Sequence, residues 1–469
     1  MKYYLAVDIG ASGGRHILGH LSGGRLIAEE IYRFDNDISE KDGEMCWDYG
    51  HLFREILEGM RRCKTLGKTP HSVGIDTWAV DFVLLDSRDE IIGSAVAYRD
   101  GRTQGADELV YAAIPEAELY ARTGIQKQIF NTVYQLASLR RDKPEQLSAA
   151  KAMLLTPDYF HFLLSGKKAT EYTNATTTQL VSPATRGWDE ALISLLGFPR
   201  DIFMPVAPPG AELGSLTQAV IAAVGYNCRV VLPATHDTAS AVLAVPAQGD
   251  ALYISSGTWS LIGTERDAAD CSPKSREYNF TSEGGYGYRY RHLKNIMGLW
   301  MIQSVVKETG CAMSYAELCA EAARVSIKSR VDCNDSRFLA PDSMVREIED
   351  YCRKTAQQIP ETVPEYASVI YNSLAVCYAA AVREIEELTG KTYADIHIVG
   401  GGSSAGYLNG LTAKYTKKRV VAGPKEATAI GNIAAQMIAA GELADIYDAR
   451  ECIGKSFEIE VFESEEFKP

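Results

Sequence analysis

The sequence predicts an α/β protein made of two domains of similar build. At 469 residues the chain is longer than one hydrophobic core usually organises. Two strand–turn–strand units with small, glycine-containing turns occur in it, over residues 3–21 and 251–263. Further strands and amphipathic helices follow each unit. We therefore expect an N-terminal domain over residues 1–245 and a C-terminal domain over residues 246–469, which begins at the segment PAQGD.

The N-terminal half begins with a predicted meander of three antiparallel strands, over residues 3–9, 16–21 and 26–34, with a glycine turn at 11–15. Leu5, Val7 and Ile9 alternate onto one face of the first strand. An amphipathic helix is predicted next, over residues 49–67, with a stripe made of Leu52, Phe53, Ile56, Leu57 and Met60. Strands at 73–77 and 81–86, a mostly helical section at 107–196, a strand at 229–235 and a helix at 238–245 follow.

The C-terminal half starts with two strands joined at Gly257 and Thr258. The stretch LKNIMGLWMIQ (293–303) is apolar and is predicted to be helical. A long helix over residues 365–388 ends at Thr389 and Gly390, which is typical of a glycine C-cap. A strand at 396–402 leads through glycines to a helix near Gly406, and a last helix is predicted over residues 426–440.

The two glycine turns are candidate phosphate-binding turns. The first contains Ala11, Ser12, Gly13, Gly14 and Arg15, and the second contains Gly257 and Thr258. Such turns let backbone N–H groups approach phosphate oxygens, which a Cβ would obstruct. A strand follows each turn, which argues against a Walker loop or a dinucleotide fingerprint. Each alone is also compatible with an ordinary hairpin, but their recurrence predicts a nucleotide held in a cleft between the domains.

Two aspartates follow predicted strands at chemically useful places. Asp8 precedes the first turn, where it would either hold Mg²⁺ through water or cap its own turn. Asp237 opens a helix, where it is either an N-cap or a base that accepts a proton from a sugar hydroxyl. A weak base suffices for phosphoryl transfer, because positioning supplies most of the catalysis. His236 and Thr238 would then hydrogen-bond other sugar hydroxyls.

Three further positions are candidates for contacts with a sugar or a nucleotide. Gly401 lies in a glycine triplet that either joins a strand to a helix or lets a flat purine or its ribose lie against bare backbone. Asn295 and Gln303 lie on roughly neighbouring faces of the stretch 293–303. One of them would contact the sugar and the other the nucleotide, or each is an ordinary surface amide.

Composition excludes several classes of protein. A net charge of -13 disfavours nucleic acid as a partner, although ATP remains compatible with it. The ten cysteines contain no C-x-x-C and no zinc-ligand spacing, so we expect reduced thiols in a cytoplasmic protein. The N-terminal apolar run is interrupted by Asp8, which argues against a signal peptide. No apolar run approaches the roughly 18 residues of a membrane span.

Taken together, these residues resemble the FGGY carbohydrate kinases across nearly the whole chain. The stretches TWAVDFVLLD, YTNATTTQL and LKNIMGLW are typical of the branch of that family that acts on L-rhamnulose. The other stretches that carry the resemblance are AYRDGRT (97–103), THDTASAV (235–242), SSGTWSLIG (255–263) and IVGGGSSAGYLN (398–409).

The resemblance implies the actin-like ATPase fold, with two ribonuclease-H-like domains and a catalytic cleft between them. It also implies ATP-dependent phosphorylation of L-rhamnulose at its C1 hydroxyl. The expected cofactors are ATP and, from the position of Asp8, Mg²⁺. Carried over by position, Asp237 matches the proton acceptor. The sugar site is matched by Ala79, His236, Asp237, Thr238 and Asn295. The ATP site is matched by Ala11, Ser12, Gly13, Gly14, Arg15, Thr258, Gln303 and Gly401.

The chain departs from the family pattern at two positions. Ala79 stands where the family often has glycine, so its methyl group would crowd the sugar, and Gly13 stands where serine is frequent. The alternatives are a kinase for another ketose, such as L-fuculose or xylulose, a non-catalytic actin-like sensor of sugar and nucleotide, and a filament-forming relative of actin. The expected partners are a ketose and ATP, not nucleic acid or a membrane, and the expected state is a monomer or homodimer.

Overall fold

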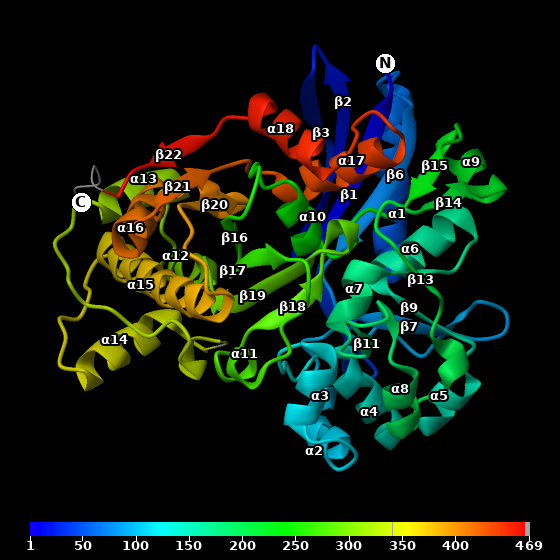
Figure 1. Ribbon diagram of the computed structural model, residues 1–469, viewed down its shortest axis with the longest axis horizontal. Helices are drawn as coiled ribbons and strands as arrows, with labels where there is room; N and C mark the ends of the chain where they lie inside the picture. Colours follow the sequence, from blue (N-terminus) through cyan, green and yellow to red (C-terminus); the bar gives the residue numbers. More distant parts are fainter. Residues whose placement is uncertain (340, 465–469) are drawn as a thin grey trace. The chain divides into compact units, whose positions relative to one another are not determined.

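The computed structural model describes residues 1–339 and 341–464, and it contains two compact units (Figure 1). The first unit is made of Met1–Ala244, Arg266–His292 and Thr428–Ser456. The second is made of Val245–Glu265, Leu293–Ala427 and residues 457–464. Each unit therefore draws on separate stretches of the chain. The predicted domain boundary between residues 245 and 246 stays a prediction.

The first unit is built on a six-stranded sheet in the order β14-β15-β6-β1-β2-β3. Strands β1, β2 and β3 pair antiparallel, which confirms the predicted meander, whereas β6 runs parallel to both β1 and β15. The strands of this sheet are β1 (Tyr3–Gly10), β2 (Gly13–Ser22), β3 (Arg25–Asp35), β6 (Pro70–Thr77), β14 (Glu212–Ser215) and β15 (Arg229–Val231).

The turn between β1 and β2 is shorter than predicted, because only Ala11 and Ser12 lie outside the strands. Gly13 and Gly14 are the first residues of β2, and Gly14 pairs with Phe34 on β3. A Cβ at Gly13 would lie 2.8 Å from the carbonyl oxygen of Phe34, and one at Gly14 would clash with the Phe34 ring. These two glycines therefore allow β3 to pack closely on β2, and the predicted five-residue turn is wrong in its extent.

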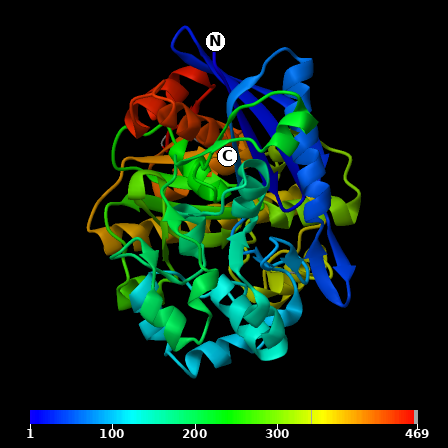
Figure 2. The same ribbon diagram turned by 90° about the vertical axis from the view of Figure 1, so that its right-hand side faces the viewer.

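Helices cover both faces of this sheet (Figure 2). Helix α1 (Tyr49–Thr65) packs on one face, where a Cβ on its Gly59 would clash with the ring of His16. The other face meets α17 (Ala427–Ala439), since a Cβ at Gly19 would lie 2.8 Å from Ile433. The predicted alternation and helical stripe are confirmed in the core: Leu5, Val7, Ile9, Leu52, Ile56 and Met60 belong to one buried cluster, against which Phe53 and Leu57 pack partly buried.

Helix α10 (Asp237–Leu243) is held tightly within the first unit. A Cβ at Gly431 of α17 would clash with the carbonyl oxygen of Ser240, so the glycine permits close approach of the two helices. Arg450 donates to the carbonyl oxygens of Val242 and Leu243 at the other end of α10. Arg450 lies on α18 (Ile446–Ser456), so the helix predicted to be the last is followed by one more.

The section over residues 107–196 is mostly helical, as predicted, with short strands between its helices (Figure 2, cyan to green). Its helices are α2 (Ala106–Tyr111), α3 (Glu116–Thr123), α4 (Thr132–Asp142), α5 (Pro144–Ala149), α6 (Thr156–Ser165), α7 (Tyr172–Thr177) and α8 (Glu190–Leu195), and α9 (Gln218–Val224) follows. The remaining paired strands are β4 (Ile38–Lys41) with β5 (Glu44–Trp47), β8 (Ile91–Ile92) with β7 (Phe82–Leu85) and β9 (Ala152–Leu155), β10 (Thr170–Glu171) with β13 (Val206–Ala207), and β11 (Val181–Ser182) with β12 (Gly187–Trp188).

The second unit repeats the strand pattern of the first. Its strands follow one another in the order β17-β16-β20-β21-β22, with β16 and β17 antiparallel and β20 parallel to β16 and β21. The first unit has the same arrangement in β2, β1, β6 and β15. The strands are β16 (Leu252–Ser256), β17 (Trp259–Arg266), β20 (Asp395–Val399), β21 (Arg419–Ala422) and β22 (Glu460–Phe462).

The helices of the second unit confirm one sequence prediction and correct another. They are α12 (Trp300–Thr309), α13 (Tyr315–Ala322), α14 (Met344–Lys354), α15 (Val363–Thr389) and α16 (Gly406–Thr416). Helix α15 ends at Gly390 in a left-handed C-cap, as predicted. The stretch 293–303 is not one helix: Asn295 lies on strand β19 (Tyr290–Met297), and Gln303 lies on α12. The break falls at Gly298, where a Cβ would lie 2.5 Å from the backbone of Trp259.

The ten cysteines are free thiols. Among the described residues, no helix combines the length and the apolar character needed to cross a bilayer.

Buried histidines make the first unit sensitive to acid. Burial lowers the pKa of His16 to about 4 and that of His161 to about 3, from an ordinary value of 6.5. At these two positions the unfolded chain therefore binds protons near pH 6.5 and the folded chain does not, so the contribution of the two histidines to stability falls as the pH drops from 6.5 toward 4. At about 1.4 kcal/mol per pKa unit, His16 alone contributes a loss of about 3 kcal/mol.

We expect the two histidines to lower the denaturant midpoint of unfolding over that pH range. His161→Gln keeps an acceptor for the N–H of Ile75, which His161 Nε2 accepts at 3.0 Å, and should make the decrease shallower. Equal changes of the midpoint in His161→Gln and in the unaltered protein between pH 6.5 and 4 would contradict the prediction.

Candidate active site

Three ionisable side chains lie in one row across the sheet of the first unit. Asp8 on β1 pairs in register with Asp76 on β6 and with Arg15 on β2. Arg15 Nε donates to Asp8 Oδ2 at 3.0 Å. Asp76 is fully buried, and Asn432 of α17 donates to its Oδ2 at 2.5 Å, while Oδ1 has no hydrogen-bond partner among the described residues. Burial, and then the charge of Asp8, raise the pKa of Asp76.

Asp237 is placed by the segment that connects β15 to α10. The strand predicted to run to residue 235 ends at Val231, and the segment then follows β6, where Thr77 N donates to Thr235 O at 3.0 Å and Thr77 bridges His236. His236 is the N-cap of α10, and Asp237 is the first helical residue. The N-cap interpretation of Asp237 is therefore wrong.

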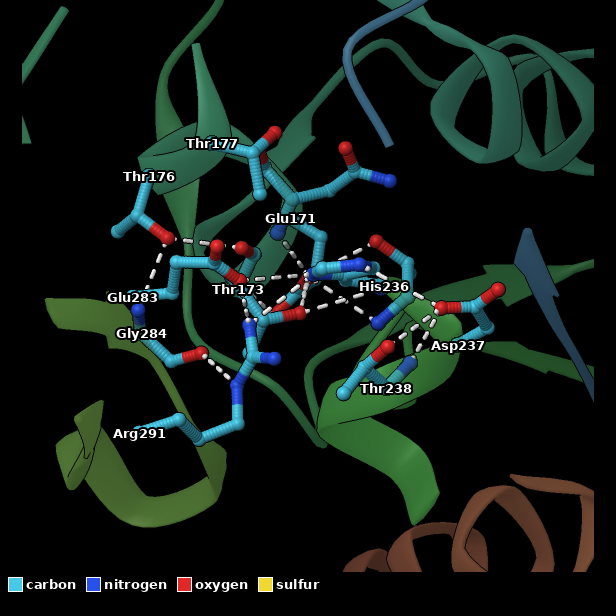
Figure 3. A network of polar contacts seen from close by, with 12 residues as sticks. Glu171, Thr173, Thr176, Thr177, His236, Asp237, Thr238, Glu283, Gly284 and Arg291 are labelled. Carbon is cyan, nitrogen blue, oxygen red and sulfur yellow. Dashed lines mark hydrogen bonds and ion pairs between the residues drawn. The ribbon is translucent and has the colours of Figure 1, made fainter. Parts of the chain in front are cut away.

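One oxygen of the Asp237 carboxylate is held and the other is available (Figure 3). Oδ1 accepts from Thr238 N at 2.5 Å and from Thr238 Oγ1 at 3.0 Å, and His236 Nε2 lies 3.4 Å away. No described residue of the first unit donates a hydrogen bond to Oδ2. The side chain is one-third exposed, at 33%. The carboxylate is thus fixed in orientation, with an oxygen left to accept a proton.

Glu171 ties the segment before Asp237 to helix α7, and the sequence analysis did not identify it. Its Oε2 accepts from Thr235 N at 3.1 Å and from Thr235 Oγ1 at 2.8 Å (Figure 3). The same carboxylate caps α7, accepting from Thr173 N, Thr173 Oγ1 and Asn174 N. Glu171 is fully buried, and this desolvation raises its pKa. The only signal for it was its place beside the stretch YTNATTTQL.

A buried ion pair lies on the other side of His236 and was also missed. Arg291, fully buried on β19, donates from Nη2 to Glu283 Oε2 at 2.9 Å and to His236 Nδ1 at 3.0 Å (Figure 3). Burial acts to raise the pKa of Glu283, but the charge of Arg291 and the hydrogen bond that it donates outweigh burial and lower that pKa. Glu283 is on β18 (Thr281–Gly284), in a segment that the sequence assigned to the other domain.

The remaining sugar candidates lie in different units. Ala79 follows β6 in the first unit and is half-buried beside Val80, whose φ of 71° is left-handed. Thr132 Oγ1 donates to the carbonyl oxygen of Val80 at 2.7 Å and holds this backbone in place. Asn295 belongs to the second unit, and its buried Oδ1 has no hydrogen-bond partner among the described residues.

The second unit ties the Gly257–Thr258 turn to the start of α12. Leu299 N donates to Gly257 O at 2.9 Å, and Trp300 N donates to Thr258 O at 3.1 Å. Helix α12 carries Gln303, so this residue and Thr258 are positioned by one connected piece of backbone. The structure thus brings together two of the nucleotide candidates.

The glycine triplet packs against the end of β16. A Cβ at Gly400 would lie 3.0 Å from the carbonyl oxygen of Ser256, and one at Gly402 would clash with the Ser256 side chain. A Cβ at Gly401 would meet nothing within 4 Å. Ser256 directly precedes Gly257, so Gly401, which is exposed, lies near the same turn.

The first turn belongs to the first unit and is attached to residue 36. Asn36 Nδ2 donates to Gly10 O at 2.9 Å, and Asn36 N donates to Ser12 O at 3.4 Å. Ser12 is exposed and Ala11 is half-buried. Backbone groups at this turn are therefore reachable from solvent.

Comparisons with known proteins agree over the whole chain. Residues 3–244 match the N-terminal domain, and residues 252–440 the C-terminal domain, of the FGGY family of carbohydrate kinases. A protein named rhamnulokinase from Halalkalibacterium halodurans is 50% identical over 99% of both chains. Another of that name, from Oceanobacillus iheyensis, is 49% identical over 97% of both chains.

Solved structures show the same fold at low sequence identity. Gluconate kinase from Lactobacillus acidophilus has a TM-score of 0.80 at 16% identity, over 98% of this chain and 93% of that chain. Xylulose kinase from Lactobacillus acidophilus has a TM-score of 0.79 at 17% identity, over 99% of this chain and 94% of that chain. The predicted two-domain α/β fold of the actin-like ATPase type is confirmed.

Proposed function

Because the chain belongs to the FGGY family of carbohydrate kinases, we propose that it transfers the γ-phosphoryl group of ATP to the C1 hydroxyl of L-rhamnulose. The products are L-rhamnulose 1-phosphate and ADP. The observation that carries the choice of sugar is the full-length similarity, at 49–50% identity, to proteins named rhamnulokinase. The fold alone does not select a sugar, since gluconate and xylulose kinases share it.

We assign the role of general base to Asp237. Its Oδ1 is occupied by Thr238, which leaves Oδ2 to accept the proton of the C1 hydroxyl. In the loose transition state of phosphoryl transfer, the hydroxyl becomes acidic late, so alignment matters more than basicity. His236, Thr238, Ala79 and Asn295 would contact the sugar.

The nucleotide is assigned to the turns and the glycine triplet. Thr258, Gln303 and Gly401 would bind it from the second unit, and the turn from Ala11 to Arg15 would contact its phosphates from the first. The support is that the Gly257–Thr258 turn, the start of α12 and the end of β16 form one connected structure. The predicted cleft between the domains stays a prediction.

The acidic residues of the first unit fit a magnesium ion bound together with ATP. Among the described residues, no group of three or more His, Cys, Asp or Glu side chains could hold a metal alone. Mg²⁺ usually keeps several waters and takes ligands from phosphates, so one or two carboxylates suffice. Asp8 would hold the ion, and Asp76 next to it in the ladder has an unpartnered buried oxygen that a cation would stabilise. The ion would neutralise charge on the phosphates.

The test is a panel of ketoses assayed for ATP-dependent release of ADP. We expect the highest kcat/KM with L-rhamnulose and lower values with L-fuculose and xylulose. Faster turnover of either of these would overturn the substrate assignment. Release of ADP with none of them would favour a non-catalytic sensor, which no present observation supports. The ten free thiols suit a reducing cytoplasm, where we place the reaction.

Gly401→Ala tests the nucleotide assignment. A methyl group there meets no protein atom within 4 Å, so we expect the fold and its thermal midpoint to stay unchanged. If adenosine lies against this glycine, KM for ATP should rise about 10-fold, equivalent to about 1.4 kcal/mol of binding. Gly249→Ala is the matched control, because a Cβ at this exposed glycine also meets nothing. An unchanged KM for ATP in Gly401→Ala would remove this residue from the site.

A further inference from the structure

The guanidinium of Arg291 is built into the first unit as a fixed hydrogen-bond donor. It is fully buried, and its Nε donates to Gly284 O at 2.9 Å. Glu283, which accepts from Nη2 at 2.9 Å, supplies the opposite charge. Gly284 is itself held, since its N–H donates to Thr176 Oγ1 of helix α7 at 2.9 Å. Two bonds in different directions therefore fix the plane of the guanidinium.

This placement determines which nitrogen of His236 carries the proton. A guanidinium has only donors, so Nδ1 of His236, 3.0 Å from Arg291 Nη2, must accept. A neutral imidazole that accepts at Nδ1 carries its hydrogen on Nε2. The competing arrangement, with Nδ1–H donating to Glu283 Oε2, spans a longer 3.4 Å and would set two N–H groups against each other at 3.0 Å.

We propose that Arg291, supported by Glu283, is a positioning residue that fixes His236 as the neutral tautomer with its proton on Nε2, and thereby turns an N–H toward Oδ1 of Asp237. His236 Nε2 lies 3.4 Å from this oxygen, which also accepts two bonds from Thr238 (Figure 3). With the other tautomer, a nitrogen lone pair would face the carboxylate and repel it.

The consequence for catalysis is an unequal pair of carboxylate oxygens. The hydrogens of Thr238 N, Thr238 Oγ1 and His236 Nε2 surround Oδ1, so Oδ2 remains the oxygen that accepts a proton. His236 also presents an N–H donor to the substrate and never an acceptor. This consequence rests on the proposed function. The tautomer of His236 does not, because it follows from Arg291 alone.

The first experiment reads the tautomer directly and needs no substrate. The chain has eight histidines, so ¹⁵N-labelled histidine side chains can be resolved by long-range ¹H–¹⁵N correlation, and His236→Asn identifies the signals of residue 236. We expect the ¹⁵N chemical shift of Nδ1 to be typical of an unprotonated nitrogen and that of Nε2 to be typical of a protonated nitrogen. A protonated Nδ1 in the unaltered protein would overturn the proposal, whatever the sugar specificity.

The same spectrum of a double variant tests whether the ion pair is the cause. Arg291→Met together with Glu283→Met removes both charges, so neither buried partner is left alone. The signals of residue 236 should then move to the averaged positions of two exchanging tautomers. Arg229→Met, a surface arginine 52% exposed, should leave the spectrum and the activity unchanged. Unchanged signals of residue 236 in the double variant would also overturn the proposal.

The second experiment is a double-mutant cycle on the kinase reaction. Arg291→Met should lower kcat/KM for the ketose by about 10²-fold, the scale of a positioned base, with KM for ATP unchanged. Arg291→Lys should recover part of the loss. In a His236→Asn background there is no tautomer to fix, so adding Arg291→Met should cost little more. If the losses of kcat/KM in the two single variants add up in the double variant, Arg291 does not act through His236.

The two experiments separate failure of the proposal from failure of the proposed function. If no ketose is phosphorylated but the expected tautomer is observed, the function is wrong and the positioning role of Arg291 stands. If L-rhamnulose is phosphorylated but the tautomer is reversed, the proposal is wrong and the function stands.

Discussion

Asp237→Asn is expected to lower kcat by about 10²-fold or more, the usual loss when a positioned base is removed. The amide keeps the size of the side chain, and its oxygen can still accept from Thr238 N and Thr238 Oγ1, so the start of α10 should keep its shape. What is lost is the oxygen that accepts the proton. The dissociation constant for the ketose should therefore change little, which calorimetry can measure beside the rate.

The control for this prediction is the same substitution at a surface aspartate. Asp201 lies at an exposed position of the same unit, so Asp201→Asn should leave kcat unchanged. Turnover of Asp237→Asn close to that of the unaltered enzyme would remove Asp237 as the base. A large loss of ketose affinity with kcat preserved would instead make it a binding residue.

Glu171→Gln is expected to lower both stability and kcat. The carboxylate accepts on both oxygens, with Thr173 N on Oε1 and Asn174 N and Thr235 N on Oε2. An amide has only one acceptor oxygen, so in either orientation its NH₂ group faces at least one backbone N–H. A buried donor left without an acceptor costs about 1–3 kcal/mol. The thermal midpoint should fall accordingly.

The loss of activity follows from the same bonds. Thr235 lies two residues before Asp237, so a loosened Thr235 N–H should let the base move, and kcat should fall more than KM for ATP changes. Glu190→Gln, at an exposed glutamate that pairs with Arg200 on the surface, should change stability by less than about 0.5 kcal/mol. Equal thermal midpoints for Glu171→Gln and the unaltered protein would contradict the prediction.

Much of the fold could be predicted from local patterns. The alternation of Leu5, Val7 and Ile9 and the glycine C-cap at Gly390 depend on residues close in sequence, and the structure confirms them. The errors arose where packing overrides local preference. Gly298 divides an apolar stretch that resembled one helix, because the chain there must pass against the backbone of Trp259.

The candidate site was only partly visible in the sequence. Asp8, Asp237 and the two turns stand next to the strand ends that the sequence predicts, where composition and spacing mark them. Glu171, Glu283 and Arg291 belong to no motif of their own, and their importance comes from partners distant in sequence. Arg291 contacts His236, 55 residues away, and Glu171 contacts Thr235, 64 residues away. Those partners become neighbours only after folding.

The sequence by itself determined the family, the α/β class and the small turns, because these depend on residue types in short stretches. The tertiary structure decided which stretches share a unit: Asn432 and Asp76, 356 residues apart, meet in one buried hydrogen bond, and residues 266–292 belong to the same compact unit as the N-terminal sheet. It also decided the protonation of His236 next to the proposed base. The physical reason is that a buried polar group must find its partner in space, and that partner is chosen by the packing of distant segments.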